Sequence, residues 1–226
     1  MRTPVFSLQY SGEEDYRWAV VRAFCAKHDP FHPLGREVFS LTFIAAYQTL
    51  LIWAFSGVPV WQTSHLPTPL NAWDALLTIG AAASILGETW TDNVQFAFQT
   101  AKHKMTPEQR AAASGDFARG FCTRGPFRFS RHLNFFCEQC FWVCIFGFTV
   151  AGGAPLLNVG GAGVAALIAL FQGSTWMTEL LTVAKYDEYR VYQRTTSRLL
   201  PWVPGPDLDS IDARRLARAV RASSNK

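Results

Sequence analysis

Residues 120–138 read GFCTRGPFRFSRHLNFFCE, and the rest of the chain is organised around this stretch. A cationic segment ending in Arg131 and His132 runs directly into an apolar stretch that carries Asn134 and Glu138. Four residues of helix rise about 6 Å, so these two polar groups lie one turn apart on one face. Acidic groups inside apolar spans are costly and are typical of functional sites. The arginines fit two interpretations: charges that flank a membrane helix, or a cationic collar for a large anionic cofactor.

The composition indicates a membrane protein rather than a soluble one. The chain has eight Trp and eighteen Phe in 226 residues, more aromatic side chains than a soluble domain of this size needs. The formal net charge of +4 is too small to indicate nucleic acid binding, and no basic run with interleaved stacking residues occurs. The first residues are polar and charged, so no cleavable signal peptide is predicted.

Four apolar blocks are candidates for transmembrane helices, each close to the ~20 residues that cross a bilayer core. They cover about residues 38–58, 71–87, 134–150 and 156–176. The second block is rich in Ala and Gly, which is typical of close helix contacts in membranes. Between the second and third blocks, Thr106-Pro107-Glu108-Gln109 has the N-cap, first-position proline and third-position glutamine of a helix start. The sequence therefore predicts an all-α polytopic membrane protein with about four transmembrane helices.

Lysine and arginine alternate between the segments that join these blocks. Five precede the first block, seven lie between the second and third, and nine follow the fourth, while the other two connections have none. Buried helices of a soluble protein would not produce this alternation. The positive-inside rule places both termini and the middle connection in the cytoplasm. We therefore predict a multi-pass protein with a membrane domain over residues 1–203 and a basic cytoplasmic tail over 204–226. The endoplasmic reticulum is the membrane we expect, which the charge pattern itself does not specify.

The cysteines of the third block can be interpreted in two ways. Cys137, Cys140 and Cys144 follow one another at spacings of three and four. A Cys-x-x-Cys pair is found in metal and redox sites, but no second pair or histidine cluster completes one here. Cysteine is also a small apolar filler in helix packing. We therefore predict packing residues and no metal site.

The predicted topology brings polar side chains of three helices to one depth at the cytoplasmic end. Glu88 and Asp92 follow the second block, and Asn134 and Glu138 begin the third. Gln172 and Glu179 lie near the end of the fourth block. Buried carboxylates need partners, so pairing with the neighbouring arginines is one interpretation. A ligand cleft open to the cytoplasm is the other, and both can hold.

At these residues the sequence resembles the steroid 5-alpha-reductase superfamily, in the branch of membrane proteins called DUF1295. The hallmark of that branch, roughly G-L-x-x-Y-S-R-H-P-N-[FY]-x-x-E, is similar to residues 125–138, GPFRFSRHLNFFCE. Similar patterns stand at residues 88–95, 171–179 and 185–193. Two residues depart from the hallmark: Pro126 stands where the hallmark has leucine, and Leu133 stands where it has proline. The proline at 126 fixes one backbone angle, and leucine at 133 provides a backbone N–H that proline would lack.

The resemblance implies NADPH as the cofactor, bound as the hydride donor for a lipid or steroid-like enone. It implies contacts to the cofactor from residues of three segments, with the arginines around the phosphates: Asp92, Arg124, Arg131, His132, Asn134, Glu138 and Tyr192. The catalytic residues are not assigned. Related reductases carry further helices before the matched part, and these hold the groups that polarise the substrate carbonyl. We therefore expect either a chain that lacks its N-terminal part or one that has lost the substrate half.

Two other functions remain open at this point. The first is a membrane methyltransferase that uses S-adenosylmethionine, since such enzymes have a similar Arg-His-Pro-x-Tyr motif. The second is a non-catalytic membrane protein that keeps the fold. In each case the expected partners are the lipid bilayer and, for an enzyme, a small lipid substrate.

Overall fold

The computed structural model describes residues 23, 37–66, 68–186 and 188–209. Most of the first 36 residues and the basic segment 210–226 lie outside the described residues, so the predicted tail is described only over 204–209. The chain divides into two compact units, residues 1–50 and 51–226, which are described separately. All described elements are helical.

The first apolar block forms one helical run from Glu37 to Ser64. Two parts of it have π-helical turns, and the parts follow in the order η1 (Ser40–Tyr47), α3 (Gln48–Ile52), η2 (Trp53–Gly57) and α4 (Val58–Ser64). Within η1 the rings of Phe43 and Tyr47 stack, with centroids 5.2 Å apart. This block is uncharged apart from Glu37 and accounts for the predicted first span.

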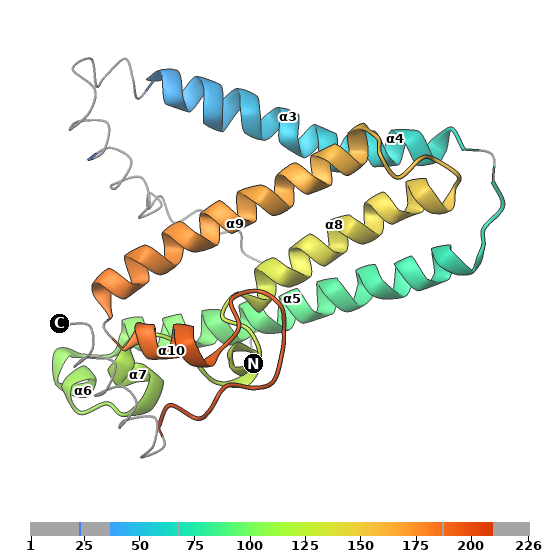
Figure 1. The fold of residues 1–226 in the computed structure, drawn as a ribbon. Helices are drawn as coiled ribbons and strands as arrows, with labels where there is room; N and C mark the ends of the chain where they lie inside the picture. The colour runs from blue at the N-terminus through green and yellow to red at the C-terminus, as the bar shows by residue number, and fades with distance from the viewer. Residues whose placement is uncertain (1–22, 24–36, 67, 187, 210–226) are drawn as a thin grey trace, which may run out of the picture. The chain divides into compact units, whose positions relative to one another are not determined.

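The unit 51–226 is built on three long helices that run antiparallel in sequence order (Figure 1). They are α5 (Ala72–Lys104), α8 (Leu133–Ala151) and α9 (Val159–Lys185). α8 lies between α5 and α9 (Figure 1). The two uncharged turns meet at one end, where the Thr68 hydroxyl donates to the Gly152 carbonyl at 3.4 Å and the Asn71 amide donates to the Ala151 carbonyl at 3.3 Å. The connection 105–132 and the segment after α9 lie at the other end, as the charge pattern predicts.

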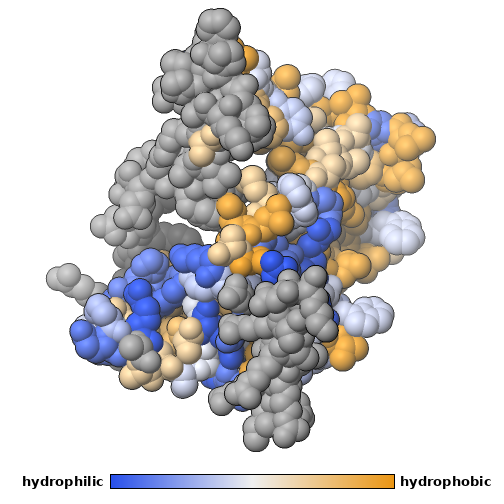
Figure 2. Space-filling model, turned by 60° about the vertical axis from the view of Figure 1, so that its left-hand side comes forward, coloured by the Kyte–Doolittle hydropathy of each residue, from blue (hydrophilic) through white to orange (hydrophobic). Residues whose placement is uncertain are grey.

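Three of the described helices are long and apolar enough to cross a membrane: Glu37–Ser64, Leu133–Ala151 and Val159–Lys185. α5 is not among them, although it covers the whole second block, because Asp74, Glu88 and small polar residues dilute its apolar part. The fold class is confirmed, and the count of four spans stays a prediction. On the face in Figure 2, hydrophilic side chains gather over one part and hydrophobic side chains over the other.

Glycines let α5 and α8 pack closely, with cysteine sulfurs filling the space above them. A Cβ on Gly87 would lie 2.9 Å from the Cys137 sulfur, and one on Gly80 would lie 3.0 Å from the Cys144 sulfur. A Cβ on Gly147 of α8 would in turn lie 2.5 Å from the Leu77 side chain. Cysteine and glycine therefore alternate across this contact, which accounts for the Gly-rich second block and for the cysteine spacing.

The polar end has a core of its own, built from short elements. α6 (Pro107–Ala111) begins with the predicted capping box, in which Thr106 and Gln109 exchange hydrogen bonds. α7 (Gly115–Arg119), the 3-10 turn η3 (Gly125–Arg128) and α10 (Tyr189–Thr195) follow. The core residues are aromatic and aliphatic: Phe121, Phe127, Tyr189, Val191, Tyr192 and Leu208. Leu208 belongs to the predicted tail, so residues 204–209 pack on the polar end.

At one position of this end, both the backbone conformation and a neighbouring side chain require glycine. Gly120 ends α7 in the left-handed region, with φ of 86°. The ring of Tyr186 lies directly over its α-carbon, where a side chain would stand. Lys102 of α5 donates to the Gly120 carbonyl at 2.7 Å and to the Tyr186 hydroxyl at 3.0 Å. Gly120 thus joins α5, α7 and the end of α9.

Candidate functional site

The motif loop 125–132 is held in place by the segment that follows α10. The Ser130 hydroxyl is completely buried and donates to the Leu199 carbonyl at 2.7 Å. The backbone N–H groups of Arg131 and His132 donate to the carbonyls of residues 197 and 198, at 2.9 and 3.1 Å. Pro126 forms part of η3 and Leu133 starts α8, so the two departures from the family hallmark fall at element boundaries.

Arg131 is buried and uses its guanidinium group within the protein. Its Nε donates to Glu179 Oε1 at 2.6 Å, and its Nη2 donates to Oε2 at 3.1 Å. Its Nη1 donates to the carbonyls of Gln193, at 2.8 Å, and Thr196. A bidentate pair of this kind is geometrically specific. Arg131 therefore joins the motif loop to α9 and to the end of α10.

His132 and Tyr192 are buried beside this pair. His132 Nε2 lies 3.1 Å from Glu179 Oε1, and Gln193 donates to the other oxygen of that carboxylate at 2.9 Å. Tyr192 is 2% exposed, and its hydroxyl donates to the Phe127 carbonyl. Burial raises the pKa of Tyr192 well above its ordinary value, so the phenol stays protonated and remains a donor.

An amide–carboxylate cluster, formed by Glu88, Asp92, Asn134 and Glu138, joins α5 to α8. Asn134 Nδ2 donates to Asp92 Oδ1 at 3.0 Å, and Asp92 is exposed. Trp142 Nε1 donates to Glu138 Oε1 at 2.8 Å, and Glu88 lies beside Glu138. The cluster therefore offers an amide and an exposed carboxylate, with two further carboxyl groups beside them.

Exposed arginines lie on the motif loop and beside it. Arg124 is 64% exposed and pairs with Asp209, which also accepts from the buried Arg119 at 2.6 Å. Arg119 is held in turn by Asp116 at 2.6 Å, and Asp116 accepts from the Thr123 hydroxyl at 2.6 Å. We call these five residues the Asp209 ion cluster. Arg128 is exposed and donates from Nη2 to the Gly205 carbonyl at 3.0 Å.

The charges in the Asp209 ion cluster shift the titration of the Asp209 carboxylate, which is partly buried. Partial burial acts to raise the pKa of Asp209, but the hydrogen bonds and charges of Arg119 and Arg124 outweigh it and hold that pKa below its ordinary value. The neighbouring Cys122 is different, because burial raises the pKa of its thiol to about 11. Cys122 is therefore a protonated thiol at neutral pH, not a nucleophile.

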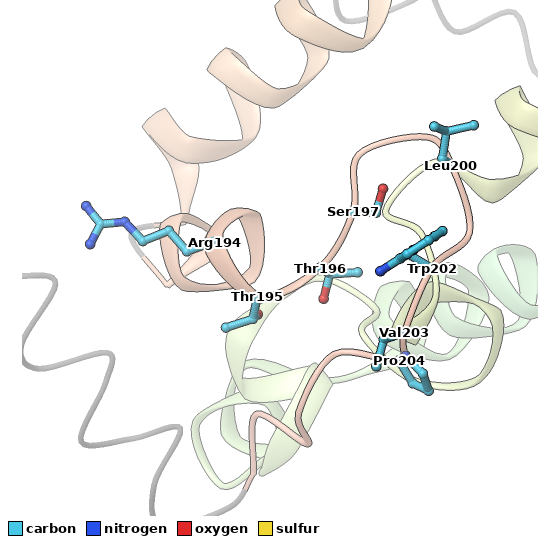
Figure 3. Close-up of a pocket in the computed structure, with 8 residues that line it drawn as sticks. All are labelled: Arg194, Thr195, Thr196, Ser197, Leu200, Trp202, Val203 and Pro204. Atoms are coloured by element: carbon cyan, nitrogen blue, oxygen red, sulfur yellow. The ribbon is translucent and has the colours of Figure 1, made fainter.

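A hollow of about 500 Å³ opens between the end of α10 and the segment after it (Figure 3). Thr196 and Ser197 lie opposite Trp202, whose indole nitrogen is directed toward Thr196, and Arg194 extends outward from the rim (Figure 3). The lining residues are Arg194, Thr195, Thr196, Ser197, Leu200, Trp202, Val203 and Pro204. None of them is acidic.

The structure separates the seven predicted cofactor residues into two groups. Asp92, Asn134 and Glu138 come together in the amide–carboxylate cluster. Arg124 is also exposed, but it pairs with Asp209. The other three are buried and satisfied within the protein: Arg131, His132 and Tyr192. Pairing with a carboxylate, one of the two interpretations of the arginines, therefore describes Arg131. Among the described residues, no group of His, Cys, Asp or Glu is placed to hold a metal ion.

Sequence reasoning missed the residues contributed by the segment after α10. Asp209 pairs with arginines 85 and 90 residues earlier, and Gly205 with Arg128 over 77 residues. No spacing rule connects such distant positions. The one available signal was the unusual composition of 199–206, LLPWVPGP, whose prolines and exposed apolar side chains do not fit a solvated tail.

The fold and the polar end together define the class of the protein. All-helical chains with several helices of membrane-spanning length and a hydrogen-bonded polar end are polytopic membrane proteins. The particular family follows from comparison: residues 6–196 match the family described as "Protein of unknown function (DUF1295)", and the chain belongs to that family.

A curated relative extends beyond this chain. The uncharacterized protein C594.04c of Schizosaccharomyces pombe is 30% identical over 207 residues, which are 89% of this chain and 58% of that protein. The chain thus spans somewhat more than half the length of the relative it matches. No solved structure matches the chain.

Proposed function

We propose that this protein is the cofactor-binding part of a membrane reductase that uses NADPH to reduce a lipid or steroid-like enone at the endoplasmic reticulum. The observation that carries the proposal is the amide–carboxylate cluster, which places an amide and an exposed carboxylate 3.0 Å apart where α5 meets α8. The resemblance of residues 125–138 to the steroid 5-alpha-reductase hallmark supports it.

The cluster fits the nicotinamide end of the cofactor. A carboxamide offers both a donor and an acceptor, and Asp92 and Asn134 offer the complementary groups. Trp142 holds the carboxyl of Glu138, which fixes its position in the cluster. When bound, NADPH supplies a hydride. The protein's own residues orient the nicotinamide ring.

In this proposal the exposed arginines bind the phosphate groups of the cofactor. Arg124 and Arg128 present guanidinium groups at the surface, and guanidinium pairs phosphate oxygens through two parallel hydrogen bonds. Arg131 has a different part, because Glu179 and backbone carbonyls occupy its donors. Arg131, His132 and Tyr192 therefore act as positioning residues that hold the motif loop, which carries Arg128 and leads into α8 with Asn134.

The same three residues favour a second candidate, a non-catalytic membrane protein that keeps the fold. Arg131 and Tyr192 donate within the protein and His132 contacts Glu179, which is sufficient for a purely structural motif. A binding measurement separates the two candidates, since a scaffold needs no nucleotide. It also separates both from a methyltransferase, which binds S-adenosylmethionine instead.

The test is titration of the purified full chain with NADPH, NADH and S-adenosylmethionine. We expect NADPH to bind more tightly than NADH. Asn134→Ala should weaken both nucleotides equally, and Arg124→Ala should weaken NADPH selectively, by about 1.5–3 kcal/mol for a charged hydrogen bond. Arg190→Ala is the matched control, because Arg190 is an exposed arginine of α10, outside the motif loop.

Three outcomes would contradict this proposal in different ways. Equal affinity for NADH and NADPH removes the phosphate role of the arginines. Tight binding of S-adenosylmethionine alone replaces the reductase with a methyltransferase, and binding of none of the three favours the scaffold. Arg131→Ala is not informative for selectivity, because we expect it to destabilise the polar end.

A further inference from the structure

The segment after α10 lies at the depth where candidate spans enter the polar end. Its residues 197 and 198 accept hydrogen bonds from the last two residues before α8, at 2.9 and 3.1 Å. The Arg198 side chain donates to Gln172 of α9 at 2.6 Å. Both α8 and α9 are apolar enough to cross a membrane. These contacts place residues 197–202 beside the boundary between the apolar and polar parts of the molecule.

At this boundary the segment exposes large apolar side chains. Leu200 is 65% exposed, Trp202 74% and Val203 71%, and Phe129 beside them is 39% exposed. The segment is fixed: Trp202 N donates to the Phe129 carbonyl at 3.2 Å, and Gly205 N donates to the Arg128 carbonyl at 2.7 Å. A fixed loop that exposes tryptophan is unfavourable in water and favourable at a bilayer interface, where tryptophan is enriched.

Behind these side chains, the hollow of Figure 3 offers hydrogen-bond donors. The hydroxyls of Thr196 and Ser197 and the indole N–H of Trp202 line it, and the Arg194 side chain extends outward from its rim. Its volume of about 500 Å³ is in the range of small-ligand sites. The lining has hydroxyl and indole donors and no carboxylate, so an anionic group can be accommodated there, and phosphate is the anionic group that phospholipids present at a bilayer surface.

We propose that residues 194–204 bind the phosphate headgroup of an anionic phospholipid, with Leu200, Trp202 and Val203 in the interfacial layer of the bilayer. The site is separate from the amide–carboxylate cluster and does not depend on the proposed reductase activity. It gives the segment after α10 two attachments: hydrogen bonds to the motif loop and a lipid at the membrane surface.

The first test measures lipid retention by native mass spectrometry of the full chain in detergent, with phosphatidylglycerol or phosphatidylcholine added. We expect preferential retention of phosphatidylglycerol. Arg194→Gln should lower it about fivefold, which corresponds to the ~1 kcal/mol of one basic residue near an anionic surface. Arg190→Gln is the matched control, with the same charge change at an exposed position of the same short helix.

The second test reports depth and does not require charge. In bilayers that contain brominated lipid, the difference in tryptophan quenching between the wild type and Trp202→Phe should show Trp202 to be strongly quenched. Equal retention of the two lipids, equal effects of Arg194→Gln and Arg190→Gln, or an unquenched Trp202 would each overturn the proposal. Displacement of phosphatidylglycerol by millimolar inorganic phosphate would also overturn it and assign the site to a soluble phosphate compound.

Discussion

Arginines of one short motif have different roles because of what surrounds each one. Arg131 is buried against Glu179, whereas Arg124 is 64% exposed and shares Asp209 with Arg119. The sequence predicted that arginines lie beside acidic groups, but it assigned Arg124 and Arg131 the same role. Burial could not be read from their spacing, since the residues that cover Arg131 lie 48 to 65 positions later.

The lowered pKa of Asp209 predicts how stability at this end depends on pH. A carboxylate whose pKa falls on folding stabilises the native state above its unfolded pKa of ~3.9, and this contribution is lost as the pH falls through the folded value. Asp209→Asn should therefore destabilise the protein by roughly 1 kcal/mol between pH 5 and 7, a modest figure because the pair is partly exposed. The wild type and the variant should converge as the pH falls below about 4.

Chemical unfolding of the detergent-solubilised protein at several pH values measures this difference. Asp207→Asn is the control, because Asp207 is exposed and its side chain accepts from the Asp209 N–H at 3.0 Å, a hydrogen bond that asparagine can keep. A difference between the wild type and Asp209→Asn that does not change with pH would show that the carboxylate charge is not responsible.

At the scale of elements, the sequence predicted the features that depend on interactions between residues close in the chain. The apolar blocks became helices, and Thr106 and Gln109 form the predicted capping box because those hydrogen bonds join residues three positions apart. The starts of α8 and α9 also fell close to the predicted blocks. The close contact of Gly87 with Cys137 was predicted only as a tendency, because its register depends on how two helices meet.

Glu179 is the residue through which α9 holds the motif loop and α10. Glu179→Leu leaves the Arg131 guanidinium buried without its counter-charge, which should cost roughly 3–5 kcal/mol. The double variant Arg131→Met with Glu179→Leu should recover much of that loss, because an apolar pair needs no compensation. Denaturant titration in detergent measures both. A double variant that is less stable than Glu179→Leu alone would contradict the role given to this ion pair.

At the scale of the whole molecule, the charge pattern and the structure make separate predictions about topology. The turns at residues 62–70 and 152–158 lie together, so cysteines introduced at 65 and 154 should be labelled from the same side of the membrane. The positive-inside rule adds that this side is the lumen, while a cysteine at 110 is labelled from the cytoplasm.

Impermeant thiol labelling of oriented membrane vesicles distinguishes the two predictions. The native cysteines are first replaced, and each single-cysteine variant is compared before and after permeabilisation. Labelling of 65 and 154 from opposite sides would contradict the arrangement of the helices. Labelling of both from the cytoplasm would contradict only the orientation and would leave the fold intact.

The contacts across the polar end also determine when it can form during synthesis. The motif loop is translated well before its partners: Glu179 follows Arg131 by 48 residues, Leu199 follows Ser130 by 69, and Asp209 follows Arg119 by 90. At 5–20 residues per second, the ribosome takes on the order of 10 s to supply them. Through that interval Arg131 lacks its partner Glu179, so the polar end cannot take its final form. A message that stops before codon 197 would lack the carbonyls of residues 197–199 that accept hydrogen bonds from the motif loop.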